Sequence, residues 1–170
     1  PLIAWTIEAA LHSRYLDRVI ISTDTQEIAQ VASTFGCEVP FLRPAEIARS
    51  ETPRSAVVLH AMEWFADYDL IMLLQPTSPL RTTADIDAAL DALLESQSTS
   101  CIGVCEAHPH PNWMKTIDES GMLHPFLPAP IADRRQDLPP VYGINGAVYV
   151  ASVAEYKAVA SFQTARTQAY

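Results

Sequence analysis

Apolar and polar residues follow two alternating periods along the chain, one typical of helices and one typical of strands. Helical spacing predicts helices over residues 2–11, 26–35, 55–65, 85–94 and 153–160. Short apolar or β-branched runs predict strands over residues 18–22, 38–41, 70–74, 101–105 and 146–151. Gly36 is expected to end the second helix, and Thr82 with Thr83 to begin the fourth. The final residues, TARTQAY, are typical of the start of a further strand.

This alternation predicts an α/β fold with a mainly parallel sheet that helices cover on both faces. The 70–74 run is the most hydrophobic, so we expect it to be a central strand. Residues 114–117 and 122–123 flank the sequence DESG and predict a small β-hairpin. Ligands in such folds bind beyond the carboxyl ends of the strands. Two polar segments occupy such places, STDT at the end of the first predicted strand and QPTSPLR after the 70–74 strand.

Composition narrows the classes of partner. The chain has 170 residues, enough for one well-buried domain, and a net charge of −9 with only 11 Lys and Arg. Nucleic-acid binding needs clustered positive charge, whereas a small anion needs only a few local arginines. No apolar run reaches the roughly 18 residues of a membrane span, and no signal peptide is visible. We therefore expect neither a nucleic acid nor a membrane as partner.

The thiols and imidazoles predict no metal site. Cys37, Cys101 and Cys105 are an odd number in apolar surroundings, which is typical of reduced, buried thiols in a cytoplasmic protein. Cys101 and Cys105 are four positions apart in a predicted strand, so we expect them to point to the same face. His108 and His110 alternate with prolines in HPHP, which more often marks an extended loop than a pair of metal ligands.

The segment LLQPTSPLR is the most unusual turn in the chain. Pro76 and Pro79 stop the preceding strand and impose a rigid, irregular turn. Taken alone, such a turn is more often a simple connection from a strand to a helix than a binding loop. Other motifs along the chain favour the binding loop.

Several segments, in this order, resemble the acylneuraminate cytidylyltransferases, the enzymes that make CMP-sialic acid and related CMP-activated nonulosonic acids. The matching segments are PLIAWTIEAAL, RVIISTDTQEIA, LRPAEIA, LLQPTSPLR, HPHPNWMK and RRQDLPPVYGINGAVYV. The resemblance implies a Rossmann-like three-layer sandwich of the nucleotide-diphospho-sugar transferase type, with a small β-hairpin dimerisation insertion. It also implies transfer of CMP from CTP to a 2-keto-3-deoxy sugar acid, with release of pyrophosphate, by a homodimer that uses Mg²⁺.

The resemblance assigns roles to particular residues. Arg43 and Arg54 are expected to bind the nucleotide, since a guanidinium fork suits phosphate or base recognition. The rigid turn is expected to present Gln75 to the sugar, while Arg135, or its neighbour Arg134, is expected to bind the sugar carboxylate through a bidentate pair. The remaining substrate-binding residues that the resemblance implies are Thr77, Ser78, Arg81, Asn145, Gly146, Tyr149 and Phe162.

Some positions have more than one interpretation. Tyr149 and Phe162 fit core packing as well as they fit a substrate pocket, and Phe162 matches an aromatic position that the family can contribute across the dimer. Asp24 ends a predicted strand and is interpreted as a helix cap. Gly143 stands where many members of the resembled family carry an arginine. The glycine in its place is expected to weaken recognition of the sugar carboxylate or to change which sugar fits.

The same resemblance places the family's phosphate-binding loop before Pro1 and its acidic metal ligands after Tyr170. We therefore expect residues 1–170 to be a single cytidylyltransferase domain that lacks its first strand and its C-terminal end, and we assign no catalytic or metal-binding residue within it. The segment ARSETPRS replaces a more acidic stretch, which leaves a base-contacting role for residues 50–55 open. Two alternatives also stay open: an enzyme that makes CMP-Kdo, and an inactive binding or oligomerisation domain of the same fold.

Overall fold

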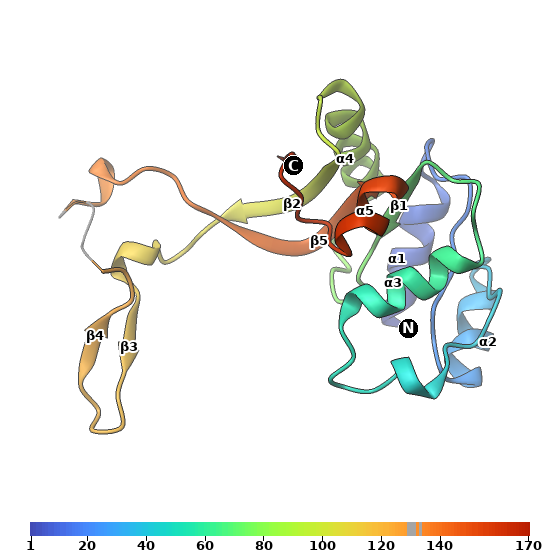
Figure 1. The fold of residues 1–170 in the computed structure, drawn as a ribbon, viewed down its shortest axis with the longest axis horizontal. Helices are drawn as coiled ribbons and strands as arrows, with labels where there is room; N and C mark the ends of the chain where they lie inside the picture. The colour runs from blue at the N-terminus through green and yellow to red at the C-terminus, as the bar shows by residue number, and fades with distance from the viewer. Residues whose placement is uncertain (129–131, 133) are drawn as a thin grey trace. The chain divides into compact units, whose positions relative to one another are not determined.

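The structure, a computed structural model, describes residues 1–128, 132 and 134–170, which fall into two units. The main unit comprises residues 1–103 and 146–170, and the insert comprises residues 104–145 (Figure 1). The helices are α1 (Leu2–Leu11), α2 (Gln26–Thr34), α3 (Arg54–Glu63), α4 (Thr83–Glu95) and α5 (Val153–Val159), with 3₁₀ turns η1 (Ala45–Ile47), η2 (Pro111–Trp113) and η3 (Arg135–Asp137). The strands are β1 (Leu70–Leu73), β2 (Ser100–Glu106), β3 (Lys115–Ile117), β4 (Leu123–Pro125), β5 (Tyr142–Ser152) and β6 (Thr167–Ala169). Among the residues described, no helix combines the length and apolar character needed to cross a membrane.

The central sheet has the strand order β1-β5-β2-β6. β1 is therefore an edge strand among the paired strands of the described residues, so the expectation that the 70–74 run is central was wrong. β5 pairs antiparallel with β1, and β6 pairs parallel with β2. At one end of the β2–β5 pair Ser152 N–H donates to Thr99 O at 2.9 Å. At the other end Ala107 N–H donates to Val141 O at 2.7 Å, so β5 also runs opposite to β2. β1, β2 and β6 therefore share one direction, which confirms a mainly parallel sheet with β5 as an antiparallel member.

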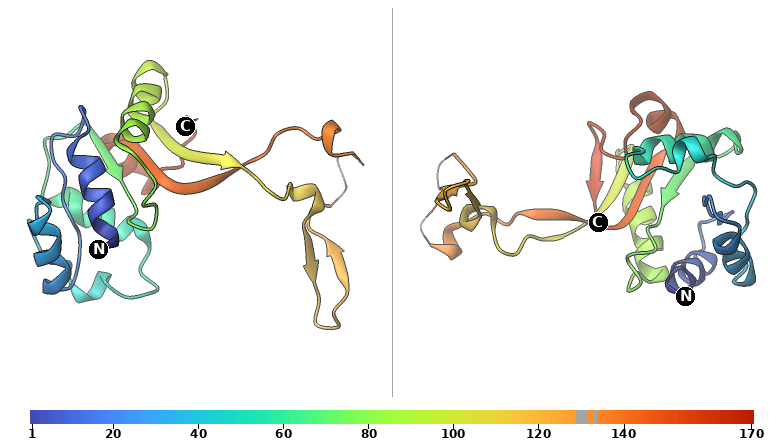
Figure 2. Two further views of the ribbon diagram at one scale, coloured as in Figure 1. Left: turned by 180° about the vertical axis from the view of Figure 1, so that it is seen from behind. Right: turned by 90° about the horizontal axis from the view of Figure 1, so that it is seen from below.

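β5 separates two apolar cores, because alternate side chains of a strand point to opposite faces. Val148 and Val150 pack with residues of α1, α4 and β2, among them Ile86. Tyr149 and Ala151 pack instead with residues of α3 and α5. The right-hand view of Figure 2 shows α3 and α4 on opposite sides of the sheet. The predicted three-layer sandwich is therefore confirmed.

The segments predicted as strands over residues 18–22 and 38–41 meet at an isolated parallel bridge between Ile20 and Glu38. Glu38 N–H donates to Val19 O, and Ile21 N–H donates to Glu38 O, each at 3.0 Å. The next amide of such a ladder would belong to Pro40, which has no N–H, so the prediction of regular strands was wrong here. The two segments still run side by side in one direction, which brings together the polar residues that follow them.

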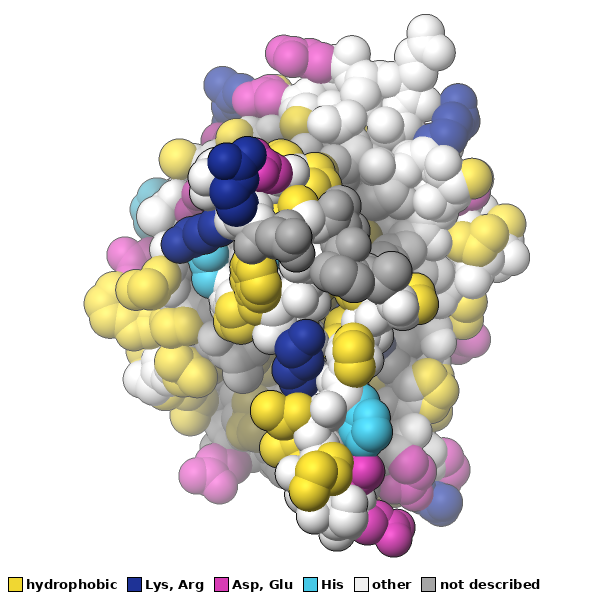
Figure 3. Space-filling view, turned by 90° about the vertical axis from the view of Figure 1, so that its left-hand side faces the viewer, with side chains coloured by type: hydrophobic (Ala, Val, Ile, Leu, Met, Phe, Trp, Pro, Cys, Tyr) yellow, Lys and Arg dark blue, Asp and Glu magenta, His cyan; other side chains and the backbone are white. Residues whose placement is uncertain are grey.

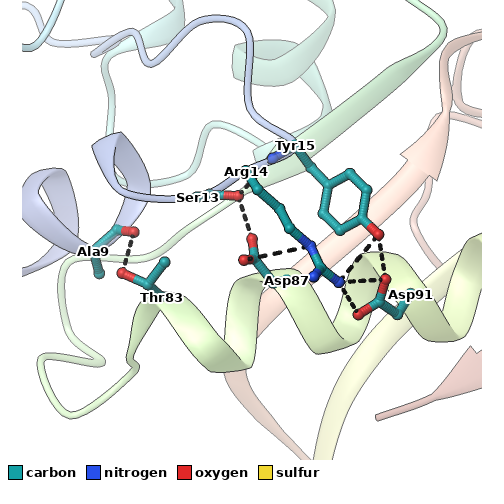
Figure 4. A network of polar contacts seen from close by, with 7 residues as sticks. All are labelled: Ala9, Ser13, Arg14, Tyr15, Thr83, Asp87 and Asp91. Atoms are coloured by element: carbon teal, nitrogen blue, oxygen red, sulfur yellow. Dashed lines mark hydrogen bonds and ion pairs between the residues drawn. The ribbon is translucent and has the colours of Figure 1, made fainter.

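Polar contacts tie the residues after α1 to α4, as Figure 4 shows. Ser13 Oγ donates to Asp87 at 2.6 Å. Arg14 Nη2 donates to both carboxylate oxygens of Asp91, at 2.9 and 2.7 Å. The Tyr15 hydroxyl donates to the same carboxylate, and this hydrogen bond lowers the pKa of Asp91. Asp91 therefore anchors two side chains that come from a distant part of the chain.

Asp91→Asn is expected to destabilise the fold at neutral pH and to have little effect in acid. The folded-state pKa of Asp91 lies below its unfolded value of about 3.9, so the carboxylate stabilises the fold above that value. The contribution is lost as the pH falls through the folded-state pKa. Urea midpoints of wild type and variant should differ at neutral pH and converge in acid. Glu95→Gln, at an exposed acid on the same helix, is the control, and an equal effect of both substitutions would contradict the assignment.

The insert contains the predicted hairpin. β3 and β4 pair antiparallel, with Ile117 opposite Leu123. In the turn between them, the carboxylate of Asp118 accepts from the amides of Ser120 (2.9 Å) and Met122 (3.0 Å). No apolar side chain among the described residues of the insert is buried. Its large exposed apolar side chains are Trp113, Ile117, Met122, Leu123, Phe126, Tyr142 and Ile144. Figure 3 shows hydrophobic side chains, in yellow, on the surface of one face of the molecule.

The three cysteines are free thiols in different surroundings. Cys37 and Cys101 are buried, as expected, and burial raises the pKa of each to about 11. Cys105 is exposed, so the expectation that every thiol is buried was wrong. Cys101 contributes to the core that contains Val148, whereas Cys105 lies near the end of β2, in the insert.

Candidate functional site

β1 leads into the turn QPTSPLR. Two successive backbone hydrogen bonds close this turn. Ser78 N–H donates to Gln75 O, and Arg81 N–H donates to Ser78 O, both at 3.2 Å. Thr77 is exposed, and Ser78 is half-buried. Thr82 follows as the N-cap of α4 and forms a capping box with the first turn of that helix. The turn is therefore fixed between a strand and a capped helix.

The side chain of Gln75 lies against the backbone of Gly146. A Cβ atom at Gly146 would stand 2.9 Å from Gln75 Oε1 and 3.9 Å from the hydroxyl oxygen of Tyr149. Gly146 has a φ of +80°, in the left-handed region that favours glycine, so both the space and the backbone favour glycine here. The structure thus brings together three of the predicted sugar-binding residues. An amide and a phenol hydroxyl that both lie near Gly146 can donate to and accept from the hydroxyl groups of a ligand.

Arg81 supports this cluster from within the protein. Only 6% of its surface is exposed. Its guanidinium donates to Ala147 O and to Thr6 Oγ1, each at 2.7 Å, and to Gln75 O at 3.2 Å. Burial lowers its pKa. The expectation that Arg81 binds substrate directly is therefore corrected, because its bonded donors face the protein itself.

Arg54 and three aromatic rings lie on the α3 face of the sheet. The guanidinium of Arg54, the first residue of α3, lies over the ring of Tyr149 at 5.0 Å from its centroid. Tyr149 packs on Phe162 with ring centroids 5.6 Å apart, and Phe162 packs on Tyr156 at 4.6 Å. Phe162 is only 5% exposed and, like Tyr149 at 7%, belongs to the core, so a direct contact of either ring with a substrate stays a prediction. Arg54 adds a positive charge beside Tyr149.

Arg43 forms a second polar cluster with the STDT segment. Its Nη2 lies 3.2 Å from Asp24 Oδ1, and its backbone N–H donates to Thr23 O at 2.7 Å. Asp24 makes no capping bond to α2, whose N-cap is Thr25, so the interpretation of Asp24 as a cap was wrong. Arg43 Nε and Ser22 Oγ are buried and lack a hydrogen-bond partner within the part of the chain that the structure describes. Unsatisfied buried polar groups are costly, so this cluster favours a polar ligand.

The insert carries the other predicted sugar-binding residues. Arg134 Nε donates to Asp137 at 2.6 Å, which engages one of the two candidate arginines. Arg135 is exposed in η3. Asn145 Nδ2 donates to a backbone carbonyl of β2 at 3.0 Å. The expected contacts of Arg135 and Asn145 with a sugar stay predictions. A Cβ atom at Gly143 would meet nothing within 4 Å among the described residues, so a larger side chain fits there.

Two supporting residues were missed by reasoning from the sequence. Thr6 accepts from Arg81, and Asp24 pairs with Arg43. No sequence signal identifies Thr6, because helical periodicity assigns a face and not a partner. Asp24 had a usable signal. A carboxylate that follows one extended segment and an arginine that follows its parallel neighbour are expected to lie close together.

The sequence model of the cytidylyltransferase family matches residues 1–141. The chain is 32% identical over 179 residues to the CMP-N,N'-diacetyllegionaminic acid synthase of Legionella pneumophila, which covers 99% of this chain and 74% of that protein. It is 29% identical over 157 residues to the N-acylneuraminate cytidylyltransferase of Escherichia coli, which covers 92% of this chain and 37% of that protein. The chain thus spans about three quarters of the first relative and less than half of the second.

Two solved structures resemble the fold. One is a CMP:2-keto-3-deoxy-manno-octonic acid synthetase complexed with CTP, with a TM-score of 0.68 and 15% identity over 100% of this chain and 79% of that one. The other is the 4-diphosphocytidyl-2C-methyl-D-erythritol synthase of Anaerococcus prevotii, with a TM-score of 0.65 and 13% identity over 99% of this chain and 78% of that one. At such low identity this likeness shows a shared fold.

Proposed function

The chain belongs to the cytidylyltransferase family, and on that basis we propose that it transfers the CMP group of CTP to a nonulosonic sugar acid of the sialic type. In this reaction the anomeric hydroxyl oxygen of the sugar forms a bond to the α-phosphorus of CTP. The bond from that phosphorus to the oxygen that bridges to the β-phosphate breaks, pyrophosphate leaves, and the hydroxyl proton is released. The products are the CMP-sugar and pyrophosphate.

The observation that carries the proposal is the contact of Gln75 with Gly146 beside Tyr149. A sugar acid presents many hydroxyl groups and one carboxylate, so it needs neutral groups that both donate and accept, together with a nearby cation. Gln75 and the Tyr149 hydroxyl supply the neutral groups. Arg54, which the resemblance assigns to the nucleotide, lies over the Tyr149 ring and so brings a cation to the same place. The short turn and its prolines hold Gln75 in place before a ligand arrives, which reduces the entropy lost on binding.

The cluster around Arg43 is the proposed nucleotide end of the site. A guanidinium forms a fixed fork of donors that suits a phosphate or the acceptor edge of a base. Asp24 holds one side of that fork at 3.2 Å, and the buried Arg43 Nε lacks a partner among the described residues. Asp24 therefore orients Arg43 and leaves donors for CTP.

Mg²⁺ is part of the proposal, as an ion that neutralises phosphate charge. Across the described residues no group of three or more His, Cys, Asp or Glu side chains is suited to hold a metal. The described residues therefore offer no set of side chains that fits a Mg²⁺ site, and we assign no ligand to the ion. A cytoplasmic location belongs to the same proposal, since free thiols such as Cys37 and Cys101 are typical of a reducing compartment.

Pyrophosphate release tests the proposed reaction. Full-length protein would be incubated with CTP, Mg²⁺ and a panel of N-acetylneuraminic, legionaminic and pseudaminic acids and Kdo. Release with a nonulosonic acid would establish the reaction and name the substrate, while release with Kdo alone would favour the CMP-Kdo alternative. Silence toward every sugar would reject the enzymatic proposal and favour a binding or oligomerisation domain.

The exposed apolar side chains of the insert support a homodimer as the working form. Ile117 and Leu123 are cross-strand neighbours and are 70% and 67% exposed. The double variant Ile117→Asp, Leu123→Asp places two charges on that face of the hairpin and is expected to convert the dimer to a monomer, as measured by light scattering. Thr116→Asp is the matched control, because alternation puts Thr116 on the opposite face. A double variant that keeps the dimeric mass would place the interface elsewhere.

A further inference from the structure

Arg81 is a buried cation whose hydrogen bonds are all with uncharged groups. A buried charge is costly unless hydrogen bonds replace its hydration. Arg81 replaces it only in part, with two backbone carbonyls and one hydroxyl, while its Nε is buried without a hydrogen-bond partner among the described residues. No carboxylate of the described residues forms an ion pair with it. Asp85 acts on its pKa only through Coulomb attraction, which is weaker than the effect of burial. Burying an unpaired charge costs free energy, and a neutral side chain could link the same chain segments without that cost.

The two carbonyls that Arg81 binds belong to the two sides of the sugar-binding cluster. Nη1 alone donates to Gln75 O at 3.2 Å and to Ala147 O at 2.7 Å. Gln75 is the residue whose side chain contacts Gly146, and Ala147 directly follows Gly146. A single nitrogen therefore links the backbone of the turn to the backbone of β5 where the two meet. The second terminal nitrogen of Arg81, Nη2, donates to Thr6 Oγ1 at 2.7 Å and so anchors the guanidinium to α1.

We propose that Arg81 is a positioning residue for the sugar acid, which acts by holding Gln75 and the Gly146 backbone at the separation that the sugar requires. This inference rests on the proposed function of the same cluster. A planar guanidinium is suited to the role, since its nitrogens reach three chain segments from one rigid group. A lysine would keep the charge but offers one nitrogen, which cannot maintain all three contacts in the same geometry.

Arg81→Lys tests the proposal through its effect on two Michaelis constants. The KM for the sugar acid is expected to rise about tenfold, the size of effect typical of losing a hydrogen bond from a charged group. The KM for CTP is expected to change less than about twofold, since Arg43 lies in a separate cluster. Arg14→Lys is the matched control, because Arg14 also joins distant segments, the residues after α1 and helix α4, but touches neither Gln75 nor Gly146. Equal changes in both Michaelis constants, or equal effects of the two variants, would overturn the proposal.

A double-mutant cycle shows whether Arg81 acts through Gln75. If it does, Arg81→Lys should change the KM for the sugar acid much less in a Gln75→Ala background than in the wild type. If Arg81→Lys changed the KM for the sugar acid equally in both backgrounds, Arg81 would not act through Gln75 and the proposed mechanism would be rejected. Both single variants must first show cooperative unfolding, and the Michaelis constants are compared well below the unfolding temperature.

Amide hydrogen exchange separates failure of this inference from failure of the proposed function. If the wild type released no pyrophosphate with any sugar, the proposed function would be rejected. The positioning role would then be decided by amide hydrogen exchange alone. In Arg81→Lys the amides at positions 78 and 81, which close the turn, should exchange faster than in the wild type, while those of α2 should be unchanged. Unchanged exchange in the turn would overturn the positioning role.

Discussion

Gly146→Ala is expected to lower kcat/KM with the sugar acid by about 100-fold, the effect typical of displacing one well-placed polar group. It is expected to lower the free energy of unfolding by only about 1–2 kcal/mol, the cost of a side chain in the left-handed region. The new Cβ would stand 2.9 Å from Gln75 Oε1, which is closer than such atoms can approach. Gln75 is the flexible partner, so its side chain moves away and the cluster is lost with little further cost to the fold. Urea denaturation and steady-state kinetics measure the two effects.

Gly121→Ala is the control that isolates the contact with Gln75. Gly121 has nearly the same backbone conformation, with a φ of +86° against +80° for Gly146, but a Cβ there would meet no described atom within 4 Å. The two substitutions should therefore have similar backbone costs, and only Gly146→Ala should reduce sugar use. If both variants lost activity in proportion to their stability, the contact between Gly146 and Gln75 would have no functional role.

Arg43→Ala is expected to raise the KM for CTP by about 30- to 100-fold and to leave the KM for the sugar acid nearly unchanged, because a charged hydrogen bond contributes roughly 1.5–3 kcal/mol. Arg43→Lys should recover little of this loss, since an ammonium cannot replace a planar fork. Asp24 should keep its place in both variants, because its backbone belongs to the segment that pairs with residues 38–43. Calorimetric titration with CTP measures binding apart from turnover.

Arg49→Ala provides the matched charge control, since Arg49 is an exposed arginine a few residues further along the chain. Loss of the same charge there should change CTP affinity less than twofold, because exposed charges are screened by salt. Equal losses in both variants would mean that net charge, and not the Arg43 cluster, determines CTP binding. The nucleotide end of the site would then have to be sought elsewhere.

The order of elements was predictable from the sequence because apolar periodicity reports burial directly. In β5, Val148 and Val150 face one core while Tyr149 and Ala151 face the other, so the strand reads as a continuous apolar run. The segments at 18–22 and 38–41 were less predictable. Their composition favours strands, but the missing N–H of Pro40 limits the ladder to one bridge. Hydrogen bonding therefore overrides composition at that point.

The sequence motifs predicted some features of the site correctly and could not predict others. A motif marks positions near a pocket, and it marked Gln75, Gly146 and Tyr149, which do meet. It does not indicate which side chains turn inward, and so Arg81, Tyr149 and Phe162 were assigned to the substrate although all three are buried. Burial of a particular side chain depends on distant elements, such as α1 for Arg81 and α5 for Phe162. Those partners cannot be read from local spacing.

The unequal burial of the thiols makes the protein suited to site-specific labelling. A thiolate is the reactive species toward maleimide and iodoacetamide reagents, so buried thiols with a pKa of about 11 react slowly at neutral pH. Cys105 is exposed and lies in the insert. A single fluorophore can therefore be attached to the insert of the natural sequence without removing Cys37 or Cys101 from the core. Energy transfer between two copies labelled in this way would report on subunit association while the chemistry of the main unit stays untouched.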